Sequence, residues 1–230
     1  MSKKIILALD TDNLETAHDW VAATKESIAF YKIGLEFFLK FGSTGLLEIK
    51  NRHGVELFLD LKLHDIPNTV KAATKSVAFL KPKFLTVHAS GGRAMVRSAV
   101  DVDPDISITA VTILTSLDSN DLVEIGFAKS PLDTAVGLAK VAVAAGATSI
   151  VCSPFEVNAI RAAVGPNIIL ITPGVRPAGA DLGDQKRVMT PQEALAAGAN
   201  YLVIGRPITE HAKKSLEEMK LVAAQISQSL

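Results

Sequence analysis

Cysteine is nearly absent from this sequence: Cys152 is the only one, so no disulfide can form within the chain. Charge of one sign is not in excess, because 24 Lys and Arg residues balance 24 Asp and Glu residues. No overall field therefore draws the chain to nucleic acid or to a membrane. Polar residues interrupt every apolar run before it reaches the length of a membrane span, and the run at residues 5–9 is too short for a signal-peptide core.

Cys/His clusters with metal-ligand spacing, low-complexity segments and linkers are also missing. Cys152 itself lies at the end of a predicted strand with no identifiable base beside it, so we interpret it as a small buried residue and not as a nucleophile. These absences favour one cytoplasmic domain over residues 1–230. We expect no metal, no nucleic-acid partner and no membrane partner.

A repeating unit runs through the chain: a short apolar run, a polar break, and then a helical pattern. The pattern predicts strands at 4–10, 28–34, 55–62, 83–88, 107–114, 148–153, 167–172 and 200–205. It predicts helices at 14–25, 35–50, 68–80, 92–100, 132–145, 154–164, 191–197 and 210–227. Gly42 and Gly45 weaken the prediction in the middle of the second helix.

Strands that alternate with helices predict a parallel sheet with right-handed crossovers. Eight such units in 230 residues favour an α/β fold of the (β/α)₈ TIM-barrel type, with an open doubly wound sheet as the alternative. No Gly-x-Gly-x-x-Gly follows the first strand, which argues against dinucleotide binding. Polar residues recur at the carboxyl ends of the predicted strands, and only a closed barrel brings all of those ends around one mouth.

The densest group of such residues is the stretch at 60–65, which reads Asp-Leu-Lys-Leu-His-Asp. Side chains alternate faces along a strand, so Asp60 and Lys62 should share one face with Phe58 while leucines occupy the other. A lysine held among carboxylates should stay protonated and can deliver a proton to a carbon that becomes electron-rich. The alternative interpretation is that these charged residues are an ordinary solvated strand end with no catalytic role. The sharp break at Ile-Pro-Asn-Thr, residues 66–69, argues against it.

Two late segments predict an anion site. Arg176 follows Pro-Gly-Val after the seventh predicted strand, and Gly205 precedes Arg206 after the eighth. Glycine lets the backbone approach a ligand closely, and each guanidinium can form two parallel hydrogen bonds to phosphate oxygens. Loops after strands seven and eight are the usual phosphate site of such barrels. The long polar loop at 177–189 is either a lid, from which Gln185 could reach a phosphate, or a surface loop with no role.

Together these segments resemble the orotidine 5′-phosphate decarboxylases of the bacterial type over nearly the whole chain. The resemblance rests on residues 7–10 (Leu-Ala-Leu-Asp), 32–34 (Lys-Ile-Gly), 60–69, 114–116 (Leu-Thr-Ser), 173–176 (Pro-Gly-Val-Arg) and 204–207 (Ile-Gly-Arg-Pro). The Asp-x-Lys-x-x-Asp element alone marks only a superfamily. Its continuation and the Pro-Gly-Val-Arg segment are much more specific.

The resemblance implies a carboxy-lyase that converts orotidine 5′-phosphate to uridine 5′-phosphate and CO₂, the last step of pyrimidine nucleotide synthesis. It implies a homodimer with shared active sites, and neither a metal nor an organic cofactor. Lys62 would protonate C6 of the pyrimidine, with Asp60 beside the departing carboxylate and positioning Lys62. Asp65 would enter from the partner subunit, and Lys32 would join the charge network.

The resemblance also implies a set of substrate-binding residues. These are Asp10 and Lys32 at the ribose, Thr69 at the ribose of the neighbouring site, Asp60 at the leaving carboxylate, Thr115 at the pyrimidine, and Arg176, Gln185, Arg206 and the Gly205 backbone at the phosphate. His64 and His88 we interpret as structural.

Two classes of rival function remain, related lyases and a non-catalytic sensor. A 3-keto-gulonate-phosphate decarboxylase or a hexulose-phosphate synthase would use Mg²⁺ on acidic groups at the same mouth, and residues 66–69 argue against both. A non-catalytic barrel that senses pyrimidine phosphates would need the phosphate-binding residues but not Lys62. The charge cluster around Lys62 therefore argues against this function.

Overall fold

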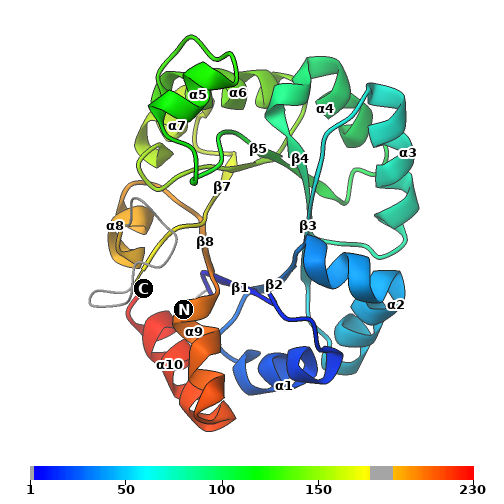
Figure 1. Ribbon diagram of the computed structural model, residues 1–230, viewed down its shortest axis with the longest axis vertical. Coiled ribbons are helices and arrows are strands. Elements are labelled where there is room, and N and C mark those ends of the chain that lie inside the picture. The colour runs from blue at the N-terminus through cyan, green and yellow to red at the C-terminus, as the bar shows by residue number, and fades with distance from the viewer. Residues whose placement is uncertain (1–2, 177–188) are drawn as a thin grey trace.

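Eight parallel strands follow one another around a closed barrel in chain order, from β1 to β8. The structure is a computed structural model that describes residues 3–176 and 189–230. Helices surround the ring of strands on the outside (Figure 1). The predicted (β/α)₈ fold is confirmed, and the open doubly wound sheet is wrong because β8 pairs with β1 and closes the ring.

The strands are β1 Ile5–Ala8, β2 Phe30–Ile33, β3 Leu57–Leu63, β4 Phe84–His88, β5 Ser107–Val111, β6 Ser149–Val151, β7 Ile169–Thr172 and β8 Tyr201–Ile204. The helices are α1 Leu14–Thr24, α2 Leu35–His53, α3 Pro67–Ala78, α4 Gly92–Val100, α5 Ser119–Glu124, α6 Pro131–Ala144, α7 Val157–Val164, α8 Pro191–Ala196, α9 Arg206–Thr209 and α10 Leu216–Gln228, with short 3₁₀ turns η1 Ala89–Gly91 and η2 Glu210–Lys213. None of these helices is long and apolar enough to cross a membrane, as far as the described residues go.

Several helical segments differ from the sequence prediction, and three of them have a clear local cause or signal. Helix α2 is broken at Gly42, whose φ of 59° and ψ of −160° are not helical. The closing helix begins at Leu216 and not at 210, because the Ser215 side chain accepts a hydrogen bond from the Glu218 N–H and caps a new helix there. Helix α5 was not predicted, although Asp118 and Asp121 form a reciprocal capping box at its start.

Alternation along each strand separates two apolar layers. Leu57 and Leu59 belong to the large core between the strands and the surrounding helices. Phe58 and Phe84 belong to a second core inside the barrel, together with Ile6 and Ile171. The barrel interior is therefore a packed core of side chains and not a pore.

The inner core should depend strongly on Phe84, which is fully buried and has its ring centroid 5.1 Å from that of Phe30 and 5.7 Å from that of Phe58. We expect Phe84→Ala to lower the free energy of unfolding by about 3–5 kcal/mol, measured by chemical denaturation. The matched control is Phe79→Ala on a side chain that is 58% exposed. That change should stay within about 0.5 kcal/mol, and equal losses in both variants would contradict this account of the core.

Candidate active site

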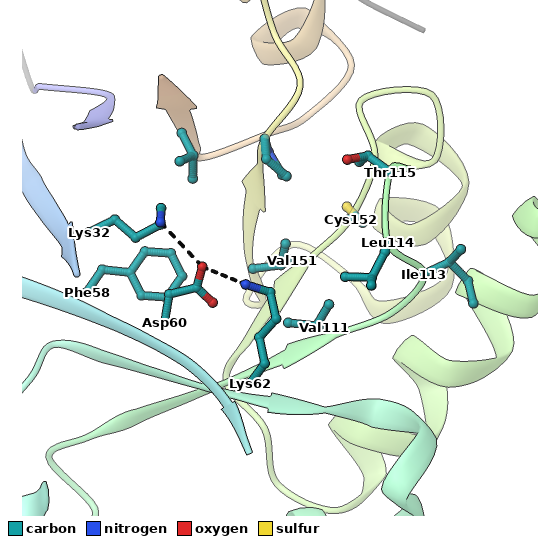
Figure 2. A pocket seen from close by; sticks show the side chains of 12 residues that line it. Lys32, Phe58, Asp60, Lys62, Val111, Ile113, Leu114, Thr115, Val151 and Cys152 are labelled. Atoms are coloured by element: carbon teal, nitrogen blue, oxygen red, sulfur yellow. Dashed lines mark hydrogen bonds and ion pairs between the residues drawn. The ribbon is translucent and has the colours of Figure 1, made fainter. Parts of the chain in front are cut away.

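A cavity of about 190 Å³ opens at the carboxyl ends of the strands. Lys32, Asp60 and Lys62 line it from β2 and β3, and apolar side chains such as Val111 and Val151 line it from β5 and β6 (Figure 2). Charged groups thus face a largely apolar wall. Electrostatic interactions are stronger in such partly desolvated surroundings than in bulk water.

Asp60 is the centre of the charge cluster. Its carboxylate atom Oδ2 lies 2.8 Å from Lys62 Nζ and 3.6 Å from Lys32 Nζ. Lys32 also reaches Asp10, with 3.2 Å between Nζ and Oδ1. Figure 2 shows the two lysines approaching Asp60 from different strands. The structure therefore brings together four of the predicted residues, Asp10, Lys32, Asp60 and Lys62.

Burial alone would raise the pKa of the Asp60 carboxyl, because it removes water from the charged form. The charges of Lys32 and Lys62, with hydrogen bonds from Lys62 and Thr86, outweigh that effect and hold the pKa below its ordinary value. Asp60 is consequently a carboxylate at neutral pH, although only 8% of the residue is exposed.

The backbone departs from a regular strand at Lys62. Its φ is 49°, in the left-handed region, where a residue with a side chain costs on the order of 1–3 kcal/mol. The pairing between β3 and β4 also shifts here, from Leu59 opposite Leu85 to Leu63 opposite Val87. Simple alternation predicted that Lys62 would face the cavity, and it does, but through this irregular backbone and not through a regular strand.

Gly34 makes room for the lysine of β2. A Cβ atom built on Gly34 would lie 3.1 Å from Lys32 Nζ and 3.5 Å from Asp10 Oδ1. A larger side chain would crowd the Lys32–Asp10 ion pair. Packing against the Lys32–Asp10 ion pair therefore explains why a glycine occupies position 34 in the Lys-Ile-Gly segment.

Within a single chain, Asp65 and Thr69 do not line this cavity. Both are exposed, and neither is among the residues that line the cavity. The Asp65 side chain accepts a hydrogen bond from the Ile66 N–H at 2.6 Å. Their predicted roles concern a neighbouring subunit, so a single chain does not test them.

The predicted anion segments frame the mouth from β7 and β8. Gly205 caps α9, and Arg206 begins that helix and shares a depression with Asp10. The backbone N–H of Arg176 donates a hydrogen bond to the Met189 carbonyl at 3.1 Å. The neighbouring Val175 forms an isolated parallel β-bridge with Met189. Gln185 lies outside the described residues, which omit 177–188.

The remaining predicted residues are at or near the cavity. Thr115 lines it (Figure 2), as does Cys152, whose thiol pKa is raised by burial so that it stays protonated. His88 packs its ring against His64, with 5.3 Å between centroids. Burial and the nearby His64 and Lys62 charges lower the pKa of His88, which fits a neutral packing residue.

Sequence reasoning missed one polar residue at this site, Thr86. It is fully buried on β4 and hydrogen-bonds both Asp60 and the backbone of Lys62. Its position was readable in principle, because Phe84, Thr86 and His88 alternate with Leu85 and Val87 and so share the inner face of the barrel.

Known proteins match this chain over most of its length. The family model described as "Orotidine 5'-phosphate decarboxylase / HUMPS family" matches residues 3–220. An orotidine 5′-phosphate decarboxylase from Thermobifida fusca is 53% identical over 209 residues, which cover 91% of this chain and 90% of that protein. One from Anaeromyxobacter dehalogenans is 49% identical over 210 residues, covering 91% of this chain and 92% of that protein.

A solved structure agrees with these relatives. The crystal structure of orotidine 5′-phosphate decarboxylase from Lactobacillus acidophilus superposes with a TM-score of 0.82 at 32% identity and covers 98% of this chain and 99% of that one.

Removal of one cation should move the pKa of Asp60. We expect Lys62→Ala to raise the Asp60 pKa toward or above the ordinary aspartate value of about 3.9. A pH titration monitored by ¹³C NMR of the aspartate carboxyl groups would measure this change. Because the native pKa lies below the unfolded one, ionised Asp60 stabilises the fold above the unfolded pKa, and this contribution is lost as pH falls through the folded pKa. In the variant this pH-dependent stabilisation should shrink, and it should vanish if the Asp60 pKa reaches its unfolded value.

The matched control is Lys40→Ala, which removes a lysine paired with exposed Asp12 at 3.1 Å. It should leave the Asp60 resonance unchanged. An Asp60 pKa that is the same in Lys62→Ala and in the unmodified protein would show that the Lys62 charge does not hold this carboxylate ionised.

Proposed function

Because this chain belongs to the orotidine 5′-phosphate decarboxylase/HUMPS family, a family that includes decarboxylases, we propose that it converts orotidine 5′-phosphate to uridine 5′-phosphate and CO₂. This reaction is the last step of pyrimidine nucleotide synthesis. The observation that carries the proposal is the buried Asp60 carboxylate with Lys62 Nζ 2.8 Å away, at the wall of a cavity at the barrel mouth.

The chemistry asks the site to stabilise charge at carbon. When the C6–carboxylate bond breaks, its electron pair stays on C6, and the ring delocalises that pair poorly. We assign Lys62 to stabilise the developing charge and then to transfer an Nζ proton to C6. Lys62 can serve because Asp60 fixes its ammonium before substrate arrives.

Asp60 would lie next to the substrate carboxylate and hold Lys62 in place. Lys32 compensates the Asp60 charge and, with Asp10, would bind the ribose hydroxyls. Thr115, at the edge of the cavity, would bond the pyrimidine. In this proposal no metal and no organic cofactor takes part, so fixed protein charges supply the stabilisation.

The phosphate would bind at the Gly205 backbone and Arg206, where α9 begins after β8, and at Arg176, which follows β7. It takes no part in bond breaking. Its binding energy can still orient the pyrimidine against Lys62, which lowers the barrier.

We also propose a cytoplasmic homodimer with shared sites. Asp65 and Thr69 are exposed around the start of α3, and Ile66 between them is 66% exposed. An apolar side chain flanked by polar ones is suited to an interface between two copies. Asp65 of the partner subunit would then complete the charge cluster, and the partner's Thr69 would reach the ribose.

The direct test is the ultraviolet absorbance of orotidine 5′-phosphate incubated with the purified protein, with and without EDTA. We expect the orotate band to disappear at the same rate in both samples. No change in either sample would overturn the proposal and favour the sugar-phosphate lyases, which 3-keto-gulonate 6-phosphate with Mg²⁺ would then test. Product binding without turnover would favour a sensor of pyrimidine phosphates.

Lys62→Ala should abolish turnover in the same assay while calorimetry still detects uridine 5′-phosphate binding. The lysine acts mainly on the transition state, so its removal should affect kcat far more than product affinity. Equal losses of turnover and of product binding would contradict the proton-donor role.

The shared site predicts complementation between two inactive variants. A dimer of one Asp65→Ala chain and one Lys62→Ala chain regains a single intact site, so equal mixing should restore about a quarter of the wild-type activity. No recovery, with subunit exchange confirmed by mass spectrometry of the mixed dimer, would argue against a site completed by the partner subunit.

A further inference from the structure

Thr86 joins the two central groups of the site through one hydroxyl. Its Oγ1 accepts a hydrogen bond from the Lys62 backbone N–H at 2.8 Å. The same Oγ1 donates to Asp60 Oδ1 at 3.0 Å. Because Lys62 Nζ binds the other carboxylate oxygen, Oδ2, a closed ring of hydrogen bonds runs from the Lys62 backbone through Thr86 and Asp60 to the Lys62 ammonium.

The strand pairing explains why a single residue can do this. Leu59 pairs with Leu85 and Leu63 pairs with Val87, so four steps along β3 match two steps along β4. Asp60, Leu61 and Lys62 therefore lie opposite Thr86 alone. This is a bulge, which disrupts the regular ladder of backbone hydrogen bonds and re-aims a side chain.

The Lys62 N–H faces a side-chain hydroxyl as a result. A partly buried N–H without a partner would disfavour the bulged backbone. The hydroxyl of Thr86 supplies the acceptor, and it does so at the residue whose φ of 49° is otherwise unfavourable. The hydrogen bond thus holds Lys62 in the conformation from which its side chain enters the cavity (Figure 2).

The side chain of Thr86 has little freedom to leave this position. It is 0% exposed, and it stands one layer above Phe84 on the inner face of β4. As an acceptor its oxygen is used by Lys62, so its own hydrogen is directed to Asp60. The hydroxyl orientation is fixed by both partners at once.

We propose that Thr86 is a positioning residue for the decarboxylation: its hydroxyl sets the backbone of Lys62 and the carboxylate of Asp60 relative to each other before substrate binds. The inference rests on the proposed function and assigns Thr86 no contact with substrate. A displacement of about 1 Å in such a group can lower a rate roughly 100-fold.

The test compares Thr86→Val, which keeps the shape and loses the hydroxyl, with Thr86→Ser, which keeps the hydroxyl. We expect Thr86→Val to lower kcat roughly 10- to 100-fold with KM for orotidine 5′-phosphate changed less than about threefold. Thr86→Ser should restore kcat to within about threefold of wild type. In Thr86→Val the Asp60 pKa, read by carboxyl ¹³C NMR, should also rise, because one hydrogen bond to the ionised form is lost while Lys32 and Lys62 remain.

Thr109→Val is the matched control. Thr109 is the β5 residue paired with Thr86, is equally buried, and bonds Ser149 at 2.6 Å, away from the charge cluster. Its kcat should stay within about threefold of wild type. Equal losses in Thr86→Val and Thr109→Val, unchanged kcat in Thr86→Val, or no rescue by serine would overturn the inference. Wild-type protein without any turnover would instead contradict the proposed function, and an unmoved Asp60 pKa would then overturn the positioning role independently of activity.

Discussion

A buried carboxylate remains ionised only when cations and hydrogen-bond donors replace the water it has lost, and Asp60 meets this condition at the mouth of the barrel. Lys62 binds one of its oxygens directly, and Lys32 stands 3.6 Å from the same atom. The other features of the site follow from this arrangement. Lys32 is shared with Asp10 and packs beside Gly34, and Lys62 adopts an unfavourable backbone conformation to reach Asp60. The apolar wall opposite keeps the charges poorly hydrated, which strengthens their interaction.

The closed barrel makes this cluster useful, because it brings strands far apart in sequence to one opening. The proposed proton donor, Lys62, comes from β3, and the proposed phosphate-binding residues Gly205 and Arg206 follow β8. Binding energy collected at the phosphate can therefore be used to orient a pyrimidine beside Lys62. An open sheet would have left these groups at separate places along its edge. The fold and the proposed chemistry are linked through this geometry.

Much of this architecture could be predicted from the sequence, because its signals are local. The alternation of apolar runs and helical patterns predicted eight strands, and strand alternation placed Phe58 and Asp60 on the inner face. Other features depend on non-local contacts. The bulge at Lys62 and the bonds of Thr86 exist only because β3 and β4 pair with a shifted register, which no spacing in either strand reveals. Helix α5 carried a readable capping signal at Asp118 and Asp121, but its polar surroundings resembled a loop.

The most direct test of the account is a crystal structure of the protein with uridine 5′-phosphate bound. The account predicts C6 of the pyrimidine roughly 3–3.5 Å from Lys62 Nζ, with the phosphate at the Gly205 backbone and Arg206. It also predicts that Asp60 keeps its contacts with Lys62 and Thr86. A nucleotide whose phosphate lies in the Asp60–Lys62 cluster, or whose C6 faces away from Lys62, would contradict the claim that this lysine delivers the proton.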